Sequence, residues 1–148
     1  MIPKIIKLNI PGITESLQTL SLKGSTRLSD NKLFYLDIDD AYIHRLFPLL
    51  KDQGIKKPDY FGKKSAGAHI TVAYPEESKV INREDLAQEH RFLINNLVAA
   101  EIGQKNYYVL LVESSSLLQL RRKYKLADLL CFKGYSIGFH ITIGVKAK

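Results

Sequence analysis

The chain has 148 residues, enough for one domain with a sizeable hydrophobic core. Hydrophobic residues make up 45% of it and charged residues 25%, which excludes the disordered and fibrous classes. Lysine and arginine number 22 against 15 acidic residues, a formal charge of +7, so anionic partners such as nucleotides or RNA are favoured.

The single cysteine, Cys131, excludes an intramolecular disulfide and a thiolate metal cluster. It lies in the apolar run LADLLCF, and we expect it in the core. The chain starts without the long apolar stretch of a secretory signal, and no window is long and apolar enough for a membrane span. We therefore expect a cytoplasmic protein with no membrane partner.

The first half of the chain shows strand and helix patterns that end in a loop. Residues 33–38 (LFYLDI) are typical of a strand, and residues 17–24 (LQTLSLKG) alternate as a hairpin partner would. Apolar side chains at helical spacing in residues 43–50 predict a helix, which Pro48 shortens. Residues 51–67 contain five lysines and several turn residues without periodicity, which predicts an exposed loop.

A further strand closes the first half, and the second half repeats the alternation of strands and helices. Residues 68–74 and 106–113 are rich in β-branched or aromatic side chains and are predicted strands. Residues 82–97 have a helix-start signature and an apolar face, and residues 117–124 follow a serine cluster suited to an N-cap; both are predicted helices. Residues 136–145 form the last predicted strand.

The predicted order is strand, helix, strand, followed by helix, strand, helix, strand. No linker composition separates the halves, so we expect a single domain over residues 1–148, built as a pseudo-duplicated α/β or α+β unit. The basic run RRKYK at residues 121–125 fits either a nucleic-acid patch or a solvated helix face, and we favour the solvated face, with Arg121 among its exposed side chains.

Two short stretches are nearly identical: GAHITVA at residues 67–73 and GFHITIG at residues 138–144. Because side chains alternate along a strand, each copy is expected to present its histidine and threonine, beside its small residues, on one face and its β-branched residues on the other. If the halves pack about a pseudo-twofold axis, both polar faces meet in one cleft. The four residues concerned are His69, Thr71, His140 and Thr142.

Two histidines that flank one site can divide general acid–base work, because their ordinary pKa near 6.5 lets one be neutral and the other protonated. Threonine hydroxyls can donate to the non-bridging oxygens of a phosphate. This set suits phosphodiester chemistry without a metal. A zinc site is the alternative, but neither strand carries a further metal-ligating side chain beside its histidine. A purely structural role, as hydrogen-bonded core histidines, is the other alternative.

At His69-Ile-Thr71-Val and His140-Ile-Thr142-Ile the sequence resembles the 2H phosphoesterase superfamily, which is named for two His-x-Thr/Ser-x motifs. The resemblance implies a bilobal fold, with two antiparallel sheets around a central cleft and helices on the outside. It implies metal-independent action on cyclic or 2′,5′-linked phosphodiesters of nucleotides or RNA ends, with the histidines as acid and base and the threonines on the phosphate. It does not say which histidine plays which part.

Several other side chains are candidates for substrate contact. Strand alternation places Lys146 on the face of His140, where it would bind phosphate. Loop lysines and aromatic rings near the motifs are candidates for phosphate binding and base stacking; they are Lys63, Lys64, Tyr60, Phe61, Tyr74 and Tyr135. We expect a monomer that needs no cofactor, and two hypotheses stay open: a phosphodiesterase, or a module that binds a nucleotide or RNA end without turnover.

Overall fold

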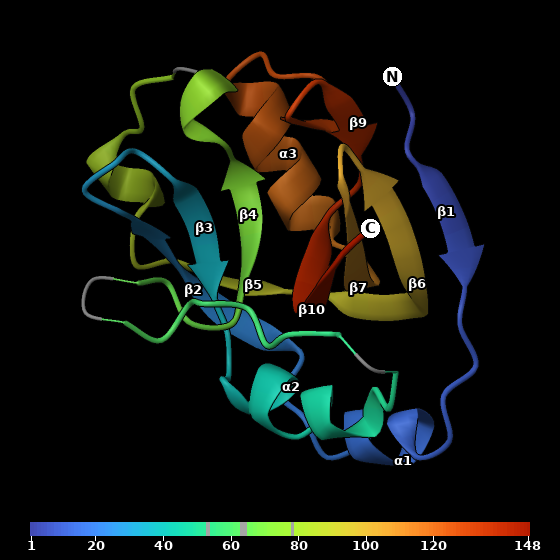
Figure 1. Cartoon of the computed structure of the whole chain (residues 1–148). Coiled ribbons are helices and arrows are strands. Elements are labelled where there is room, and N and C mark those ends of the chain that lie inside the picture. The colour runs from blue at the N-terminus through green and yellow to red at the C-terminus, as the bar shows by residue number, and fades with distance from the viewer. Residues whose placement is uncertain (53, 63–64, 78) are drawn as a thin grey trace.

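The computed structural model describes residues 1–52, 54–62, 65–77 and 79–148. Over these residues the chain forms two four-stranded sheets and one two-stranded sheet, all antiparallel, with short helices around them (Figure 1). The α+β prediction is therefore confirmed. No helix within these ranges is long and apolar enough to cross a membrane.

The first sheet has the strand order β1-β6-β7-β10 and the second has the order β4-β3-β2-β5. The strands of the first sheet are β1 (Lys4–Lys7), β6 (Leu93–Ile102), β7 (Lys105–Glu113) and β10 (His140–Ala147). Those of the second are β4 (His69–Ala73), β3 (Phe34–Asp37), β2 (Lys23–Leu28) and β5 (Glu89–Arg91). Each motif strand is therefore at the edge of its sheet, and Figure 1 shows β4 and β10 at the centre of the molecule.

The remaining elements are short. A two-stranded sheet pairs β8 (Leu130–Phe132) with β9 (Tyr135–Ile137). The helices are α1 (Ile13–Leu17), α2 (Ala41–His44) and α3 (Ser115–Lys123), and the 3₁₀ helices are η1 (Phe47–Leu49), η2 (Pro75–Glu77) and η3 (Arg83–Asp85). The predicted serine cap is present, because the Ser114 hydroxyl accepts a hydrogen bond from the Leu117 amide at 3.3 Å.

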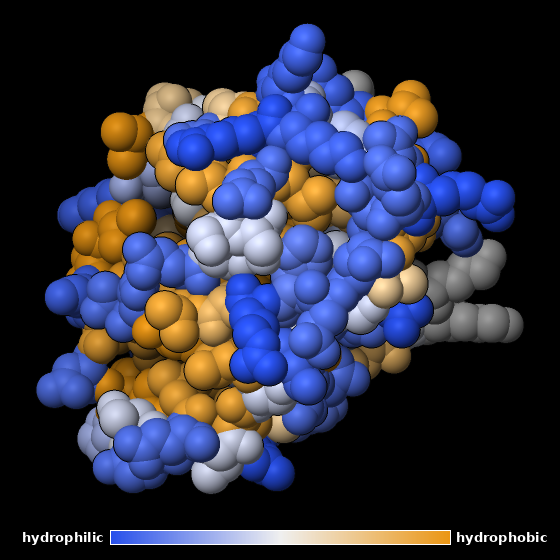
Figure 2. Space-filling model, turned by 180° about the vertical axis from the view of Figure 1, so that it is seen from behind, coloured by the Kyte–Doolittle hydropathy of each residue, from blue (hydrophilic) through white to orange (hydrophobic). Residues whose placement is uncertain are grey.

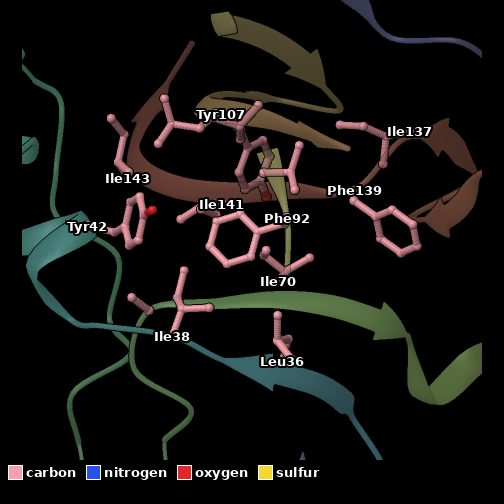
Figure 3. Close-up of a cluster of buried hydrophobic side chains, with 14 of the residues drawn as sticks. Leu36, Ile38, Tyr42, Ile70, Phe92, Tyr107, Ile137, Phe139, Ile141 and Ile143 are labelled. Atoms are coloured by element: carbon pink, nitrogen blue, oxygen red, sulfur yellow. The ribbon is translucent and has the colours of Figure 1, made fainter. Parts of the chain in front are cut away.

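The core lies between the two sheets, where the motif isoleucines meet. Ile70 of β4 and Ile141 of β10 are fully buried, and Figure 3 shows them on facing strands with Tyr42 and Phe92 close by. Burial of these side chains joins the sheets through the hydrophobic effect. On the outside, apolar residues also reach the surface. In the rear view of Figure 2 they gather in the left half, which is the side that carries β1.

The prediction of a helix over residues 82–97 is wrong. The chain there forms η3, β5 and β6, and β6 pairs with β1 on one side and β7 on the other. Tertiary pairing has overridden a helical spacing of apolar residues. The hairpin partner at residues 17–24 is also misplaced, because α1 ends at Leu17 and β2 begins only at Lys23. Cys131 is exposed on β8 rather than buried in the core.

Arg121 was expected in solvent, yet its side chain is fully buried. It makes an ion pair with Glu77, whose carboxylate oxygen lies 2.7 Å from an Arg121 guanidinium nitrogen. The neighbouring Arg122 follows the prediction and forms an exposed pair with Asp128. Helical periodicity misassigns Arg121 because a long cationic side chain can be buried where carboxylate and carbonyl acceptors surround it.

Both motif strands change register just after the threonine. In β4, Thr71 pairs with Tyr35 and Ala73 with Phe34, so Val72 has no partner. In β10, Thr142 pairs with Val109 and Gly144 with Tyr108, so Ile143 has no partner. Each extra residue forms a β-bulge, which reverses the alternation of the residues that follow. The expectation that Ala73 and Gly144 share the face of their histidines is therefore wrong.

We predict that two glycine substitutions differ in cost because their neighbours differ. A Cβ atom at Gly24 would overlap the Asp37 carbonyl oxygen, which the strand pairing holds in place. At Gly144 it would lie 2.8 Å from a methyl group of Ile55 and 3.0 Å from one of Leu50, and side chains can move. Gly24→Ala should lower the unfolding free energy by about 1–3 kcal/mol and Gly144→Ala by less.

Urea denaturation measures both losses, with Gly62→Ala as the control because its nearest atom, the Ser65 hydroxyl oxygen, would lie at an ordinary 3.5 Å. A larger loss for Gly144→Ala than for Gly24→Ala would contradict the register of β2 on β3.

Candidate functional site

A cavity of about 340 Å³ lies between the polar faces of the two motif strands. All four motif side chains line it, so the structure brings together what the repeat predicted: His69, Thr71, His140 and Thr142. The aromatic residues Tyr60, Tyr74, Tyr107 and Phe132 complete much of its wall. The cavity is at the small end of the range for ligand sites, which suits a small molecule or a chain end.

The first motif is held in place by its own backbone. The His69 ring donates from Nδ1 to the Gly67 carbonyl oxygen at 2.7 Å, and Asp40 accepts from the Ala68 amide at 2.9 Å. Gly67 has a φ of 68°, and a Cβ atom there would lie 2.5 Å from an Asp40 carboxylate oxygen. Glycine adopts this positive φ without strain and has no Cβ atom to overlap Asp40, which explains why a glycine lies two residues before the histidine.

The second motif orients its histidine in the same way. The His140 ring donates from Nδ1 to the Gly138 carbonyl oxygen at 2.8 Å. A carbonyl oxygen can only accept, so Nδ1 carries the proton in both histidines. Nε2 is therefore the basic nitrogen of the neutral ring in each case. The two imidazoles thus have the same tautomer, set by the same local contact.

Burial changes the protonation of both rings. It lowers the pKa of His140 to about 4, against the effect of the Gly138 carbonyl, and a charge on His69 would lower this pKa further. Burial also lowers the pKa of His69, while the Gly67 carbonyl and Asp37 act in the opposite direction. At neutral pH the cavity therefore holds two neutral histidines, and not the one neutral and one protonated ring expected from the ordinary pKa.

The two histidines differ in their neighbours across the sheet. Asp37 lies directly opposite His69, whereas the apolar Leu111 lies opposite His140. His69 also has the Tyr60 and Tyr35 rings edge-on, at centroid distances of 4.8 and 5.6 Å. A nearby carboxylate stabilises an imidazolium, so His69 is the better placed of the two to carry a proton.

Each motif threonine lies beside a tyrosine hydroxyl. Thr71 is buried and makes a hydrogen bond to Tyr74. Burial raises the pKa of Tyr74, and the hydrogen bond to Thr71 lowers it by a smaller amount. Thr142 makes the corresponding contact with Tyr60, whose pKa burial also raises. Both phenols are therefore protonated at neutral pH, and they add two hydroxyl groups to the wall next to the threonines.

Three of the predicted contacts are not in the cavity, and one of them, Phe61, is exposed and stacks on His44 instead. Lys146 lies beyond the β10 bulge, which turns it to the other face of the sheet, where its ammonium donates to Asp52 at 3.0 Å. Tyr135, in β9, does not line the cavity and packs against the core. Tyr74 does line it, as predicted. Lys63 and Lys64 lie outside the described residues.

An aromatic corner of the cavity was missed by the sequence analysis. Phe132 of β8 stacks on Tyr74 at a centroid distance of 5.0 Å, and Tyr107 of β7 meets Phe132 edge-on at 5.6 Å. The Lys133 ammonium donates to the Tyr107 hydroxyl at 3.2 Å and lies 5.2 Å from the Phe132 ring centroid. Tyr107 could have been found by pairing β7 with β10, since it is two residues from Val109, the partner of Thr142.

The side chains around the cavity combine bases with hydroxyl groups. Two imidazole bases, that of His140 buried and that of His69 half-buried, line a space of small-molecule size together with the hydroxyl groups of seven described residues. Among the residues that the structure describes, no group of three or more His, Cys, Asp or Glu side chains is arranged to hold a metal ion. The arrangement suits proton transfer at a bound phosphate or similar oxyanion.

Comparison with known proteins agrees with this site. The family model described as the Swiss Army Knife 2H phosphoesterase domain matches residues 34–148, a range that contains both motif strands. A search of curated proteins and a search of solved structures found no match. The family match covers most of the chain, and the matched range contains the two histidines and two threonines that meet in one cavity. The chain therefore belongs to the 2H phosphoesterase family.

Proposed function

We propose that the protein is a metal-independent phosphodiesterase that acts on cyclic or 2′,5′-linked phosphodiesters of nucleotides or RNA ends. Membership in the 2H family indicates phosphoesterase activity. The observation that supports the finer proposal is the matched pair of histidines, each bonded through Nδ1 to a glycine carbonyl and each lining the same cavity. Two histidines oriented in the same way can act on the two sides of one phosphorus atom, one at the attacking water and the other at the leaving oxygen.

For a 2′,3′-cyclic phosphate the proposed step runs as follows. His140 Nε2 takes a proton from water while the water oxygen forms a bond to phosphorus. The bond from phosphorus to one ribose oxygen breaks, and His69 gives its Nε2 proton to that oxygen. The product is a phosphomonoester with a free neighbouring hydroxyl. His140 then loses its proton to solvent and His69 regains one.

His69 is assigned the acid because of its neighbours. The substrate brings a negative charge into a cavity where both rings are otherwise neutral. That charge raises the pKa of each histidine, and Asp37 adds to the effect at His69. His140, opposite Leu111, stays neutral and able to accept a proton. Thr71 and Thr142 donate to the non-bridging oxygens as charge grows on them in the transition state.

A binding module without turnover is the second candidate. The observation that favours it is that burial lowers the pKa of both histidines, so the ligand-free site holds no acid at neutral pH. Such a site would bind a nucleotide or RNA end through hydroxyl and imidazole groups alone. The two candidates differ in turnover, which the following experiment measures.

The first prediction concerns the two histidines. Wild-type protein with EDTA present should hydrolyse at least one member of a panel of 2′,3′-cyclic nucleotides, 2′,5′-oligoadenylate and cyclic dinucleotides. His69→Ala and His140→Ala should each lower kcat on the order of 10²–10⁴-fold, because each removes one proton-transfer group. His44→Ala is the control, since His44 contacts Lys57 and Phe61 and does not line the cavity.

Ligand binding without turnover on the whole panel would select the binding module. Loss of turnover on adding EDTA would contradict the metal-independent mechanism.

The second prediction concerns the protonation of the histidines. In the ligand-free protein, NMR titration should give His140 a pKa of about 4 and His69 a pKa below the ordinary 6.5. Adding a nucleoside 2′-monophosphate should raise the pKa of His69, because the anion favours the imidazolium. Ordinary values near 6.5 for both rings in the free protein would contradict their burial.

The third prediction separates Thr142 from Lys146. Thr142→Ala should lower kcat at least about tenfold, since it removes a donor to the transition state. Lys146→Met should leave kcat/KM within about twofold, because the ammonium only makes a half-exposed ion pair with Asp52 on the other face. Steady-state kinetics on the best panel substrate measures both. An equal loss in the two variants would show that Lys146 reaches the substrate.

A further inference from the structure

We propose that Arg121 is a positioning residue for the first half of the site: its buried guanidinium fixes the strand end that carries Thr71 and Tyr74. The inference rests on the proposed function, because Thr71 is given the task of holding the phosphate. Arg121 takes part in no step of the proposed reaction, and its role would be to hold groups that do. Arg121 itself does not line the cavity.

The guanidinium uses every donor it has. Arg121 Nε donates to the Ala127 carbonyl at 2.7 Å. One terminal nitrogen donates to the Val72 carbonyl at 2.7 Å and to Glu77 at 3.1 Å. The other donates to Glu77 at 2.7 Å and to the Leu129 carbonyl at 3.0 Å. These five bonds match the five N–H groups of an arginine, and no lysine could reproduce them.

Three of these bonds hold the backbone that directly follows Thr71. Val72 is the bulged residue that follows Thr71 directly, so its carbonyl fixes the point where β4 leaves its register. Glu77 also accepts a hydrogen bond from the Tyr74 amide at 2.9 Å. The hydrogen bond to Val72 therefore holds the β4 bulge, and the ion pair with Glu77 holds Tyr74, whose hydroxyl contacts Thr71.

The other two contacts hold the opposite side of the aromatic corner. The Ala127 and Leu129 carbonyls belong to the segment between α3 and β8, and β8 carries Phe132. Phe132 stacks on Tyr74 inside the cavity. One side chain thus connects α3, the end of β4 and the start of β8, which together form one wall of the site.

The desolvation free energy of the buried Arg121–Glu77 ion pair argues for a role beyond stability. A buried ion pair gains little net free energy over a well-packed apolar pair, because both charges lose their hydration. What it does provide is a defined geometry, since a planar guanidinium accepts few arrangements of its partners. A transition state is sensitive to displacements of about 1 Å in the groups that bind it.

The second half of the site supplies a matched control. The bulge after Thr142 is held by backbone pairing of Val145 with Lys56, in bonds of 2.7 and 2.9 Å, and by packing of Leu50 and Ile55 against Gly144. Arg121 makes its bonds on the other motif strand. If Arg121 acts through the first half only, its loss should matter to Thr71 and not to Thr142.

A double-mutant cycle tests this directly. Arg121→Lys in the full chain should lower kcat on the order of 10- to 100-fold with a smaller change in KM. In a Thr71→Ala background the same substitution should lower kcat by no more than about twofold, because the group it positions is gone. In a Thr142→Ala background the full factor should persist. Arg122→Lys is the control, since Arg122 forms a similar but exposed carboxylate pair on the same helix.

An equal loss in both threonine backgrounds would overturn the proposal and leave Arg121 with a general structural role. Glu77→Gln replaces Arg121→Lys if the lysine variant fails to fold, because glutamine keeps an acceptor for the Tyr74 amide. If the wild-type protein hydrolyses no substrate, the proposed function has failed. The positioning role of Arg121 is then tested by NMR. Arg121→Lys should shift the Thr71 methyl resonance and leave that of Thr142 in place; a shift in neither would refute it.

Discussion

Packing of Ile70 against the β10 side of the core, where Ile141 and Ile143 are also buried, is the interaction on which the site depends. Ile70 and Ile141 each lie between a histidine and a threonine on an edge strand. Burying it between the two sheets brings β4 and β10 together. Strand alternation then directs both polar pairs into the cavity on the other side. The same three-residue pattern therefore builds the core and the site.

This arrangement decides the electrostatics as well. Because the polar pairs lie at the junction of two sheets, the imidazoles are desolvated and their pKa values fall. The Nδ1 bonds to Gly67 and Gly138 preserve the tautomer that exposes a basic Nε2. In the mechanism that we propose, His69 holds the proton for the leaving oxygen only when an anionic substrate is present. Charge brought by the substrate would thus switch on the acid that its own reaction requires.

The repeat carries most of what sequence could predict, because alternation and duplication are local signals. The meeting of both motifs was predicted from them, whereas the strands at 68–74 and 106–113 were predicted from their β-branched and aromatic side chains. Lys146 was misplaced because a β-bulge cannot be seen in an alternating pattern. Arg121 was misplaced because its partners Glu77 and Val72 are 44 and 49 residues away and only the folded chain brings them near. Pairing between distant strands likewise overrode the helical spacing of residues 82–97.

The central claim is that two fixed histidines divide one displacement at phosphorus between them. The most direct measurement is hydrolysis of a nucleoside 2′,3′-cyclic phosphate in ¹⁸O-labelled water with EDTA present, followed by ³¹P NMR. The account predicts one ¹⁸O atom bound to phosphorus and a single phosphomonoester isomer, since the acid stands on one side of the site. A mixture of 2′ and 3′ isomers, or ¹⁸O bound to a ribose carbon and not to phosphorus, would contradict it.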